Sequence, residues 1–553
     1  MTSVSRLPAM RLSLADRRIE ILAYGAILIV AAALRLGDLA VRGTWDADQG
    51  HDMLVLRGLV LDGRIPLLGP PTSIGDFHHG VLYYLLLAPA AALSRADPVA
   101  VTTFIALCGV AAVAVTGWLA RSIAGPIAGL IAALLLAVSA SAVEESIFIW
   151  NPNLIALSSS IALAAAWRAW TGGRARWWLV AGAAAVVTMH CHVLGTVLTP
   201  VIAGLLVADV RRRRRRGDDR GAASVSRAAL GWLGLALLSY LPLALHELGS
   251  GGSELRAAAS FLLDGGGSAS MSLPARLPIV ALRVVGWPLT GLITAAPLAT
   301  ILATSLVVGL AVWRGWLARR SLPASESMGG ASAPEPERTA VRWLALGLAW
   351  TVVALAAGAA SLATVIAGLP NDHYHAFADP MVVALVAVGL AGLWQGATVA
   401  PPVGRVVAIA IVMALVGWNL AHQPPGRAAD GGWQAALGAA GRVAAIAGSE
   451  PVVLSSLPTF KSDEALRMPL AAVGADLMPA GVNGAAFGGA TATRVILCDQ
   501  LFHESIGADC GGPAEDAWLA DPESGLLLTG ATLPTLIERF EAAPGRWISV
   551  YRP

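Results

Sequence analysis

Long apolar stretches recur along this chain and constrain its fold more than any other feature. Eleven of them can be distinguished, and their lengths are comparable with the roughly 20 residues that a helix needs to cross a bilayer. Because lipid offers the backbone no hydrogen-bond partners, such segments cross membranes as helices. The chain is 56% hydrophobic and only 13% charged, whereas soluble domains have about twice that charge density. The sequence therefore predicts a polytopic α-helical membrane protein.

The order of the apolar stretches predicts the topology. The predicted spans lie near residues 20–40, 99–119, 124–143, 154–170, 177–192, 193–209, 227–247, 293–313, 342–369, 380–396 and 405–421. With the N-terminus inside, the arginine-rich loops, including Arg211 to Arg216, all fall on the cytoplasmic side, as the positive-inside rule expects. The arginine run is typical of a topology signal that contacts anionic lipid. Nucleic-acid binding is the weaker alternative, and we expect no nucleic-acid partner.

One apolar stretch does not fit this count as a span. The segment "HGVLYYLLLAPAAAL" (79–93) has only about 15 residues, which suits an interfacial helix better than a membrane-spanning one. Residues 41–98 are therefore expected to form one extracytoplasmic loop with two juxtamembrane helices, at about 50–61 and 79–93. The Gly- and Pro-rich segment between them is typical of a turn-rich connector.

The C-terminal part has a different character. Residues 422–553 contain no spanning run, and the sequence predicts strands at 451–456, 494–499 and 546–553 and an amphipathic helix at 532–543. This pattern predicts a transmembrane module over residues 1–421 and a small extracytoplasmic α/β domain over 422–553. Outside the cytoplasm, a disulfide between Cys498 and Cys510 is plausible, but the sequence leaves the state of these cysteines open.

Polar residues that could carry chemistry gather in five places, all on the predicted outer side. Ionisable groups at the level of a membrane are costly and usually mark a functional site. The five groups are "DADQGHD" with Asp46, Asp48, His51 and Asp52; "GDFHHG" with His78 and His79; "EESIFIWNPN" with Glu144 and Asn151; "HCH" with His190 and His192; and "PNDHYHAFADP" with His373, Tyr374 and His375.

Each group also has a purely structural interpretation. The aspartates of the first group can cap the helix that follows, because Asp is favoured at a helix N-terminus. The glutamates are typical of a solvated loop, and the Tyr and His residues are typical of a membrane-interface belt. Two histidines separated by one residue form a weak metal-ligand pattern. We therefore predict no metal site and no cofactor, and a divalent metal stays an open alternative.

Taken together, the five groups suit group transfer. A carboxylate at a rigid helix start can act as a general base, provided that it reaches the hydroxyl that it deprotonates. His, Tyr and Asn donors suit a phosphate or a sugar, and a departing phosphate needs such donors for its developing charge.

The residues of the first outer loop resemble a known family. The stretch "WDADQGHDMLVLRGLVLDGRIPLLGP" followed by "FHHGVLYYLLLAPA" is similar to the first extracytoplasmic loop of GT-C superfamily glycosyltransferases, in the branch of the protein mannosyltransferases and aminoarabinose transferases. Asp48 and Gln49 occupy the family's acidic Asp-Glu motif, and His79 to Tyr83 occupy its His/Lys-Pro-Pro-Leu-x-Tyr motif. The likeness covers residues 20–210 well and 340–420 weakly.

The resemblance implies a polyprenyl-phosphate sugar donor, an extracytoplasmic site and inversion at the sugar carbon. It also implies that Asp48 is the catalytic base. The chain departs from the family pattern where Gln49 replaces the second acid, where Gly80-Val81 replaces Pro-Pro, and where Asn151 and Asn153 stand near an expected acid.

We therefore predict a multi-pass glycosyltransferase of a bacterial plasma membrane, which transfers a sugar from a polyprenyl-phosphate donor to a hydroxyl of an extracytoplasmic acceptor. Asp48 is the predicted base, with Asp46 assisting. The predicted substrate-binding residues are His78, His79, Glu144, Asn151, His190, His192, His373, Tyr374 and His375. Two alternatives stay open: a transporter or flippase of lipid-linked saccharides, and a non-catalytic protein that binds them.

Overall fold

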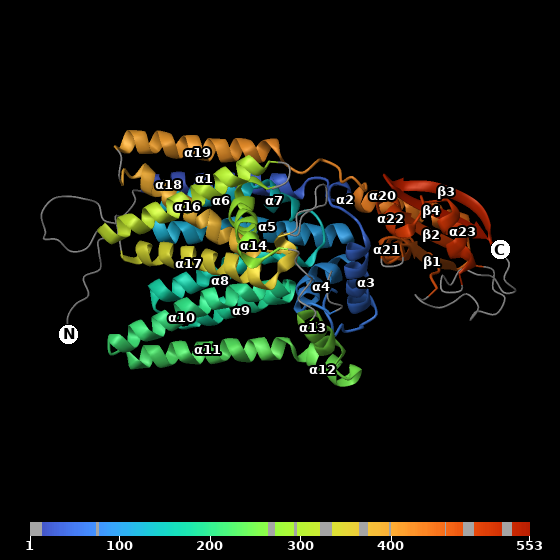
Figure 1. The fold of residues 1–553 in the computed structure, drawn as a ribbon, viewed down its shortest axis with the longest axis horizontal. Coiled ribbons are helices and arrows are strands. Elements are labelled where there is room, and N and C mark those ends of the chain that lie inside the picture. Colours follow the sequence, from blue (N-terminus) through green and yellow to red (C-terminus); the bar gives the residue numbers. More distant parts are fainter. Residues whose placement is uncertain are drawn as a thin grey trace, which may run out of the picture.

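The structure is a computed structural model of the 553-residue chain. It describes residues 14–72, 77–263, 271–291, 296–320, 335–363, 374–397, 400–458, 461–478, 492–521 and 533–552. Helices from the first part of the chain form a long bundle, and a small sheet with its own helices lies at one end of it (Figure 1).

Eleven helices correspond one to one with the eleven predicted spans, which confirms the predicted fold class. They are α1 (Leu14–Leu36), α5 (Pro98–Ala124), α6 (Pro126–Val138), α8 (Ile155–Gly172), α9 (Arg176–Cys191), α10 (Leu198–Arg215), α11 (Asp219–Ser239), α16 (Pro297–Arg320), α17 (Glu335–Gly358), α18 (Asp379–Trp394) and α19 (Pro401–Ala421). Within the described part of the chain, nine helical segments are long and apolar enough to cross a membrane. The other two of the eleven, α6 and α9, have 13 and 16 residues. At the centre of the bundle, 94% of the α18 segment is buried.

Two helices of the first loop lie at the end of the bundle that faces the sheet (Figure 1). They are α3 (Ala47–Leu61) and α4 (Leu82–Ser94), close to their predicted positions, and the short α2 (Leu39–Arg42) leads into them. The short helices α7 (Ala140–Glu144), η1 (Asn151–Leu154), η2 (Val193–Val197), η4 (Ala360–Ala363) and η5 (Ala376–Ala378) connect the bundle helices.

A group of helices between α11 and α16 was not predicted. It comprises α12 (Leu241–Ser250), α13 (Ser253–Leu263), α14 (Leu273–Ala281), the π-helical turn η3 (Leu282–Gly286) and α15 (Trp287–Thr290). Segment 273–290 contains three prolines, which argue against a continuous spanning helix from sequence. In the fold it packs against α16 and α17 and is mostly buried from Arg283 onward.

The C-terminal part is a four-stranded mixed sheet in the order β1-β2-β4-β3. Its elements are α20 (Gly432–Ala447), β1 (Val452–Leu457), α21 (Glu464–Ala472), β2 (Thr493–Asp499), η7 (Gln500–Phe502), α22 (His503–Ile506), α23 (Pro513–Ala520), β3 (Thr535–Ala543) and β4 (Arg546–Arg552). Strands β1 and β2 run parallel, and β4 is antiparallel to both β2 and β3. Cys498, in β2, forms a disulfide with Cys510.

The predicted helix at 532–543 is wrong, because residues 535–543 form strand β3. Ala543 pairs with Arg546, so Pro544 and Gly545 form a two-residue hairpin loop. Gly545 has a φ of 77°. A type II turn needs a positive φ at its second central residue, where glycine is favoured, and proline is common at the first. The Pro-Gly pair was the local signal for a hairpin, and the apolar spacing of the segment did not reveal it.

Candidate active site

Helix α3 begins at the acidic segment of the first loop, and its start is held from both sides. Asp46 is the N-cap residue, and its backbone N–H donates to Gln49 Oε1 over 2.9 Å. Gln49 Nε2 donates in turn to the carbonyl of Ile149, 2.8 Å away. A carboxylate could not donate this second bond, which gives a physical reason for an amide at the family's second acidic position.

The Asp46 side chain is bound by two cations of the C-terminal part. It accepts from Arg546 Nη2 over 2.7 Å and forms an ion pair with Lys461. Partial burial acts to raise the pKa of Asp46, but the charges of Arg546 and Lys461 outweigh it and hold the pKa below its usual value. Asp46 is therefore part of the contact between α3 and the C-terminal part, and it does not line the cavity described next.

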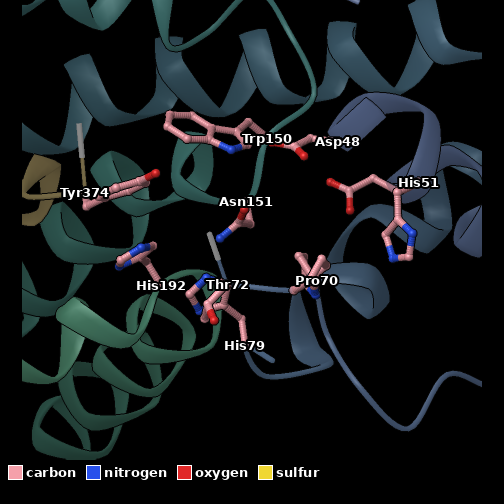
Figure 2. A pocket seen from close by; sticks show the side chains of 11 residues that line it. Asp48, His51, Pro70, Thr72, His79, Trp150, Asn151, His192 and Tyr374 are labelled. Atoms are coloured by element: carbon pink, nitrogen blue, oxygen red, sulfur yellow. The ribbon is translucent and has the colours of Figure 1, made fainter. Parts of the chain in front are cut away.

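A pocket with about 530 Å³ of empty space, part of it open to solvent, lies beside α3. In Figure 2, Asp48 and His51 lie on one side of it, and His192 and Tyr374 lie opposite. The cavity is lined by Asp48, His51, Asp52, Pro70, Pro71, Thr72, His79, Trp150, Asn151, His192 and Tyr374. We call Asp48, His51 and Asp52 the acidic wall, and we call Trp150, His192 and Tyr374 the aromatic wall.

The two carboxylates of the acidic wall differ in their surroundings. Asp48 is exposed at the cavity, yet neighbouring protein atoms displace much of its solvating water. This desolvation, together with the negative charge of Asp46, raises the pKa of Asp48. Asp52 is only 3% exposed, and burial raises its pKa to about 7 although hydrogen bonds from Tyr83 and Tyr84 act the other way. Both phenolic O–H groups donate to Asp52 over 2.8 Å.

Asp52 lines the cavity, although the sequence analysis named it only within the acidic group, with helix capping as the alternative, and gave it no role of its own. The signal that could have singled it out is the pair Tyr83-Tyr84 at the start of the second juxtamembrane helix, because buried phenols need acceptors. In the fold, their shared acceptor joins α4 to α3.

This arrangement makes Asp52 a source of pH-dependent stability. Its pKa in the folded protein, about 7, lies above that of an unfolded aspartate, so between about pH 4 and 7 the folded state holds the proton more tightly. Asp52 therefore favours the folded state at low pH, and this contribution is lost as the pH rises through 7. In detergent, we expect the thermal midpoint of the wild type to fall between pH 5 and 8 by more than that of Asp52→Asn.

The control for this experiment is Asp62→Asn, which changes an exposed acid at the end of the same helix. It should keep the pH dependence of the wild type. An equal slope in Asp52→Asn and the wild type would contradict the proposed titration of Asp52.

His51 completes the acidic wall and is paired with the C-terminal part. Its Nδ1 lies 3.0 and 3.2 Å from the two carboxylate oxygens of Glu464, on α21. Partial burial acts to lower the pKa of His51, but the hydrogen bond and negative charge of Glu464 outweigh it, and the pKa is raised.

The opposite side of the cavity consists of rings. The imidazole of His192 stacks on Tyr374, with centroids 4.2 Å apart, and lies 4.7 Å from His79. Tyr374 in turn contacts Trp150 at 5.4 Å. Burial lowers the pKa of His79 to about 4, so this ring is neutral near pH 7. Flat apolar rings beside neutral hydrogen-bonding groups suit a sugar.

Other predicted binding residues do not line the cavity. His78 is bound to Glu254 of α13, with Nδ1 3.0 Å from Oε1. His190 lies 2.8 Å from the Ser239 hydroxyl and stacks on Tyr240. Glu144 is exposed, and His375 is fully buried against Trp287. His373 lies outside the described residues. Of the predicted binding residues, the structure thus brings His79, Asn151, His192 and Tyr374 together around the cavity.

Gly80 stands where the family has proline, and the fold supplies a reason. A Cβ atom at this position would overlap the imidazole of His190. Asn151 is held by a hydrogen bond from its Nδ2 to the carbonyl of Cys191, next to both histidines of the "HCH" segment. The close packing of residues 80 and 190 therefore leaves no room for a side chain at position 80.

Metal binding has no visible site in the part of the chain that the structure describes. No group of three or more His, Cys, Asp and Glu side chains is arranged there to hold an ion. Of the described residues that line the cavity, none is lysine or arginine.

A comparison with known proteins finds one family model that matches part of the chain. Residues 78–243 match the family model of the dolichyl-phosphate-mannose-protein mannosyltransferases; this range includes the His79, Asn151 and His192 positions but not α3. No curated protein sequence matches the chain.

The fold is similar to that of ArnT from Cupriavidus metallidurans. The crystal structure of apo ArnT has a TM-score of 0.52 at 13% identity and covers 97% of this chain and 98% of that chain. The structure of ArnT bound to undecaprenyl phosphate has a TM-score of 0.52 at 12% identity, with 96% and 97% covered. The chain therefore shares the fold of ArnT, and residues 78–243 are similar to the dolichyl-phosphate-mannose-protein mannosyltransferases.

Proposed function

We propose that this protein transfers a sugar from a polyprenyl-phosphate donor to a hydroxyl group of an acceptor outside the cytoplasm. The observation that carries the proposal is the cavity in which the acidic wall of α3 faces the aromatic wall. The family match from residue 78 to 243 supports the same activity. The complex of ArnT with undecaprenyl phosphate, a structure of similar fold, supports the donor class.

Asp48 is the proposed general base. It accepts the proton of the acceptor hydroxyl while the hydroxyl oxygen forms a bond to the anomeric carbon of the sugar. The bond between that carbon and the phosphate oxygen breaks, and its electron pair leaves with the polyprenyl phosphate. Attack opposite to the leaving group inverts the configuration at the sugar carbon. The raised pKa of Asp48 brings a carboxylate closer to the working pH, as an efficient base requires.

Asp46 has a different proposed role from the one that the sequence suggested. Its two ion pairs with Arg546 and Lys461 leave the N-cap carboxylate occupied. It therefore fixes the start of α3, and hence the position of Asp48 two residues later, without contacting the acceptor.

The proposed orientation puts the cavity and the C-terminal part outside the cytoplasm. The arginines 211–216 lie where α10 turns into α11, far from the sheet (Figure 1), and such clusters mark the cytoplasmic side. The disulfide between Cys498 and Cys510 suits an oxidising compartment. Both observations support the same orientation.

The test uses the full chain in proteoliposomes. Undecaprenyl-phosphate sugars with different headgroups, mannose and aminoarabinose among them, are supplied with a membrane extract as acceptor, and the release of undecaprenyl phosphate and labelled product is measured. We expect release with at least one donor. Translocation of intact donor without release would establish a flippase, and saturable donor binding without either event would establish a non-catalytic binder; both would overturn the proposal.

A further inference from the structure

One residue of the acidic wall, His51, forms an ion pair with the C-terminal part. His51 lines the cavity, and its Nδ1 is bound by both oxygens of Glu464 from α21. This contact spans 413 positions of the sequence. It leaves the other ring nitrogen, Nε2, free of this pair. Figure 2 shows the ring of His51 on the α3 side of the cavity.

The cavity needs a positive group if it is to receive a phosphate. Phosphate sites in proteins usually contain arginine or lysine, and none of the described lining residues is of either kind. His79, which also lines the cavity, is neutral because burial lowers its pKa to about 4. His51 has a carboxylate partner, Glu464, and a carboxylate beside a histidine favours its charged form.

On this basis, and resting on the proposed function, we infer that Glu464 of the C-terminal part holds His51 as an imidazolium beside the cavity, and that the Nε2–H of this imidazolium donates a charge-assisted hydrogen bond to the donor phosphate. Glu464 is a positioning residue that acts through His51. The C-terminal part then contributes to donor binding through a side chain that does not itself line the cavity.

The other charged groups around His51 are consistent with this role. Asp48 and Asp52, on the same helix, add negative charge that favours the imidazolium, and the raised pKa of His51 reflects all three acids. Lys461, in the segment before α21, is paired with Asp46. Glu464 itself is held by the Ser462 hydroxyl, 2.8 Å away, so its carboxylate is fixed in place.

The packing of α21 against α3 also fixes the distance between His51 and Glu464. Gly50, one residue before His51, lies directly against the backbone carbonyl of Glu464, with no room for a Cβ atom between them. The Trp45 indole donates to the next carbonyl, that of Ala465, over 2.8 Å. Helix α21 thus packs closely against the start of α3, which holds Glu464 beside His51.

The test compares Glu464→Gln with the wild type in donor binding as a function of pH. Full-length protein in nanodiscs is titrated with undecaprenyl phosphate at pH 6 and at pH 8. Removing the carboxylate lowers the pKa of His51, so the variant should lose its imidazolium at a pH roughly one unit lower. We expect the affinity of the variant for undecaprenyl phosphate to fall roughly tenfold at pH 8, because a His51 pKa lower by one unit reduces the imidazolium fraction roughly tenfold. At pH 6 the affinity should change little.

Two further variants sharpen the comparison. Glu464→Asp keeps the charge and should recover a large part of the binding at pH 8. Glu504→Gln makes the same substitution at an exposed position of α22 and should match the wild type at both pH values. The probe's own phosphate titrates near pH 6, but this titration is common to all variants and cancels in their ratios.

Near-normal binding by Glu464→Gln at pH 6 demonstrates that the variant is folded. Equal weakening at both pH values, or no change at either, would overturn the inference. Sugar transfer by the wild type with an unshifted pH profile in Glu464→Gln overturns the inference and leaves the proposed function intact. pH-dependent binding of undecaprenyl phosphate with no transfer supports the inference and overturns the proposed function.

Discussion

Replacing Asp48 by asparagine is expected to lower the rate of sugar transfer by roughly 10²–10⁴-fold, the usual contribution of a positioned general base. The substitution keeps the shape of the side chain at the start of α3 and removes only its ability to accept a proton. Donor binding should therefore change little, so that kcat falls while the affinity for undecaprenyl phosphate is retained. The measurement is single-turnover release of undecaprenyl phosphate from a labelled donor in proteoliposomes.

The pH profile gives this experiment a second readout. A base must be unprotonated, and the pKa of Asp48 is raised by desolvation and by the charge of Asp46. Transfer by the wild type should therefore decline on the acid side at a higher pH than for an ordinary aspartate. Asp62→Asn, at the far end of α3, is the matched control and should retain full activity. Retained turnover in Asp48→Asn, with loss in Asp52→Asn, would assign the base to Asp52 instead.

The second large effect is expected from a single methyl group at the contact between α3 and α21. Alanine is a better helix former than glycine by about 1 kcal/mol, so Gly50→Ala would stabilise an isolated α3. In the fold, however, the new Cβ would overlap the backbone carbonyl of Glu464. Because backbone atoms cannot rotate away, we expect a net destabilisation of roughly 1–3 kcal/mol, the usual cost of overpacking.

Gly58→Ala on the same helix provides the matched control. A Cβ there would meet only the flexible side chain of Arg64, at 3.4 Å, so this substitution should be neutral or slightly stabilising. Gly50→Ala should also separate α21 from α3 and reduce transfer, because it disturbs His51 and Asp48 together. Thermal unfolding in detergent and the transfer assay test both outcomes. Equal midpoints for the two variants would contradict the tight contact at Gly50.

The predictions from sequence succeeded where one local property decides the structure. Apolar length identified all eleven bundle helices, and the short run at 79–93 identified the 13-residue helix α4. Helix α3 was expected at about 50–61 with Asp46 or Asp52 as its cap, and it begins at Ala47 with Asp46 as the N-cap residue. Buried apolar runs identified β1, β2 and β4, since strands buried on both faces read as continuous hydrophobic segments.

The predictions fell short where a structure depends on distant partners. Lys461 and Arg546 are 415 and 500 positions from Asp46, and no local pattern indicates that these residues meet. Edge strand β3 leaves Leu536 and Ile537 exposed, so its apolar residues gave a misleading helical spacing. Asp52 could be interpreted as a helix cap until its two tyrosine partners were known. Gln49 could be interpreted as a lost acid until its hydrogen bond to Ile149 was known.

The seating of α21 on α3 has a consequence for the order of biogenesis. The acidic segment is made early, close to the first membrane helix, whereas Lys461, Glu464 and Arg546 are synthesised more than 400 residues later. The environment of Asp48 and His51 is therefore incomplete until residues 461–546 have been synthesised and the sheet has folded against α3. A nascent chain in which the helices up to α19 are already inserted therefore still lacks the partners of Asp46 and His51.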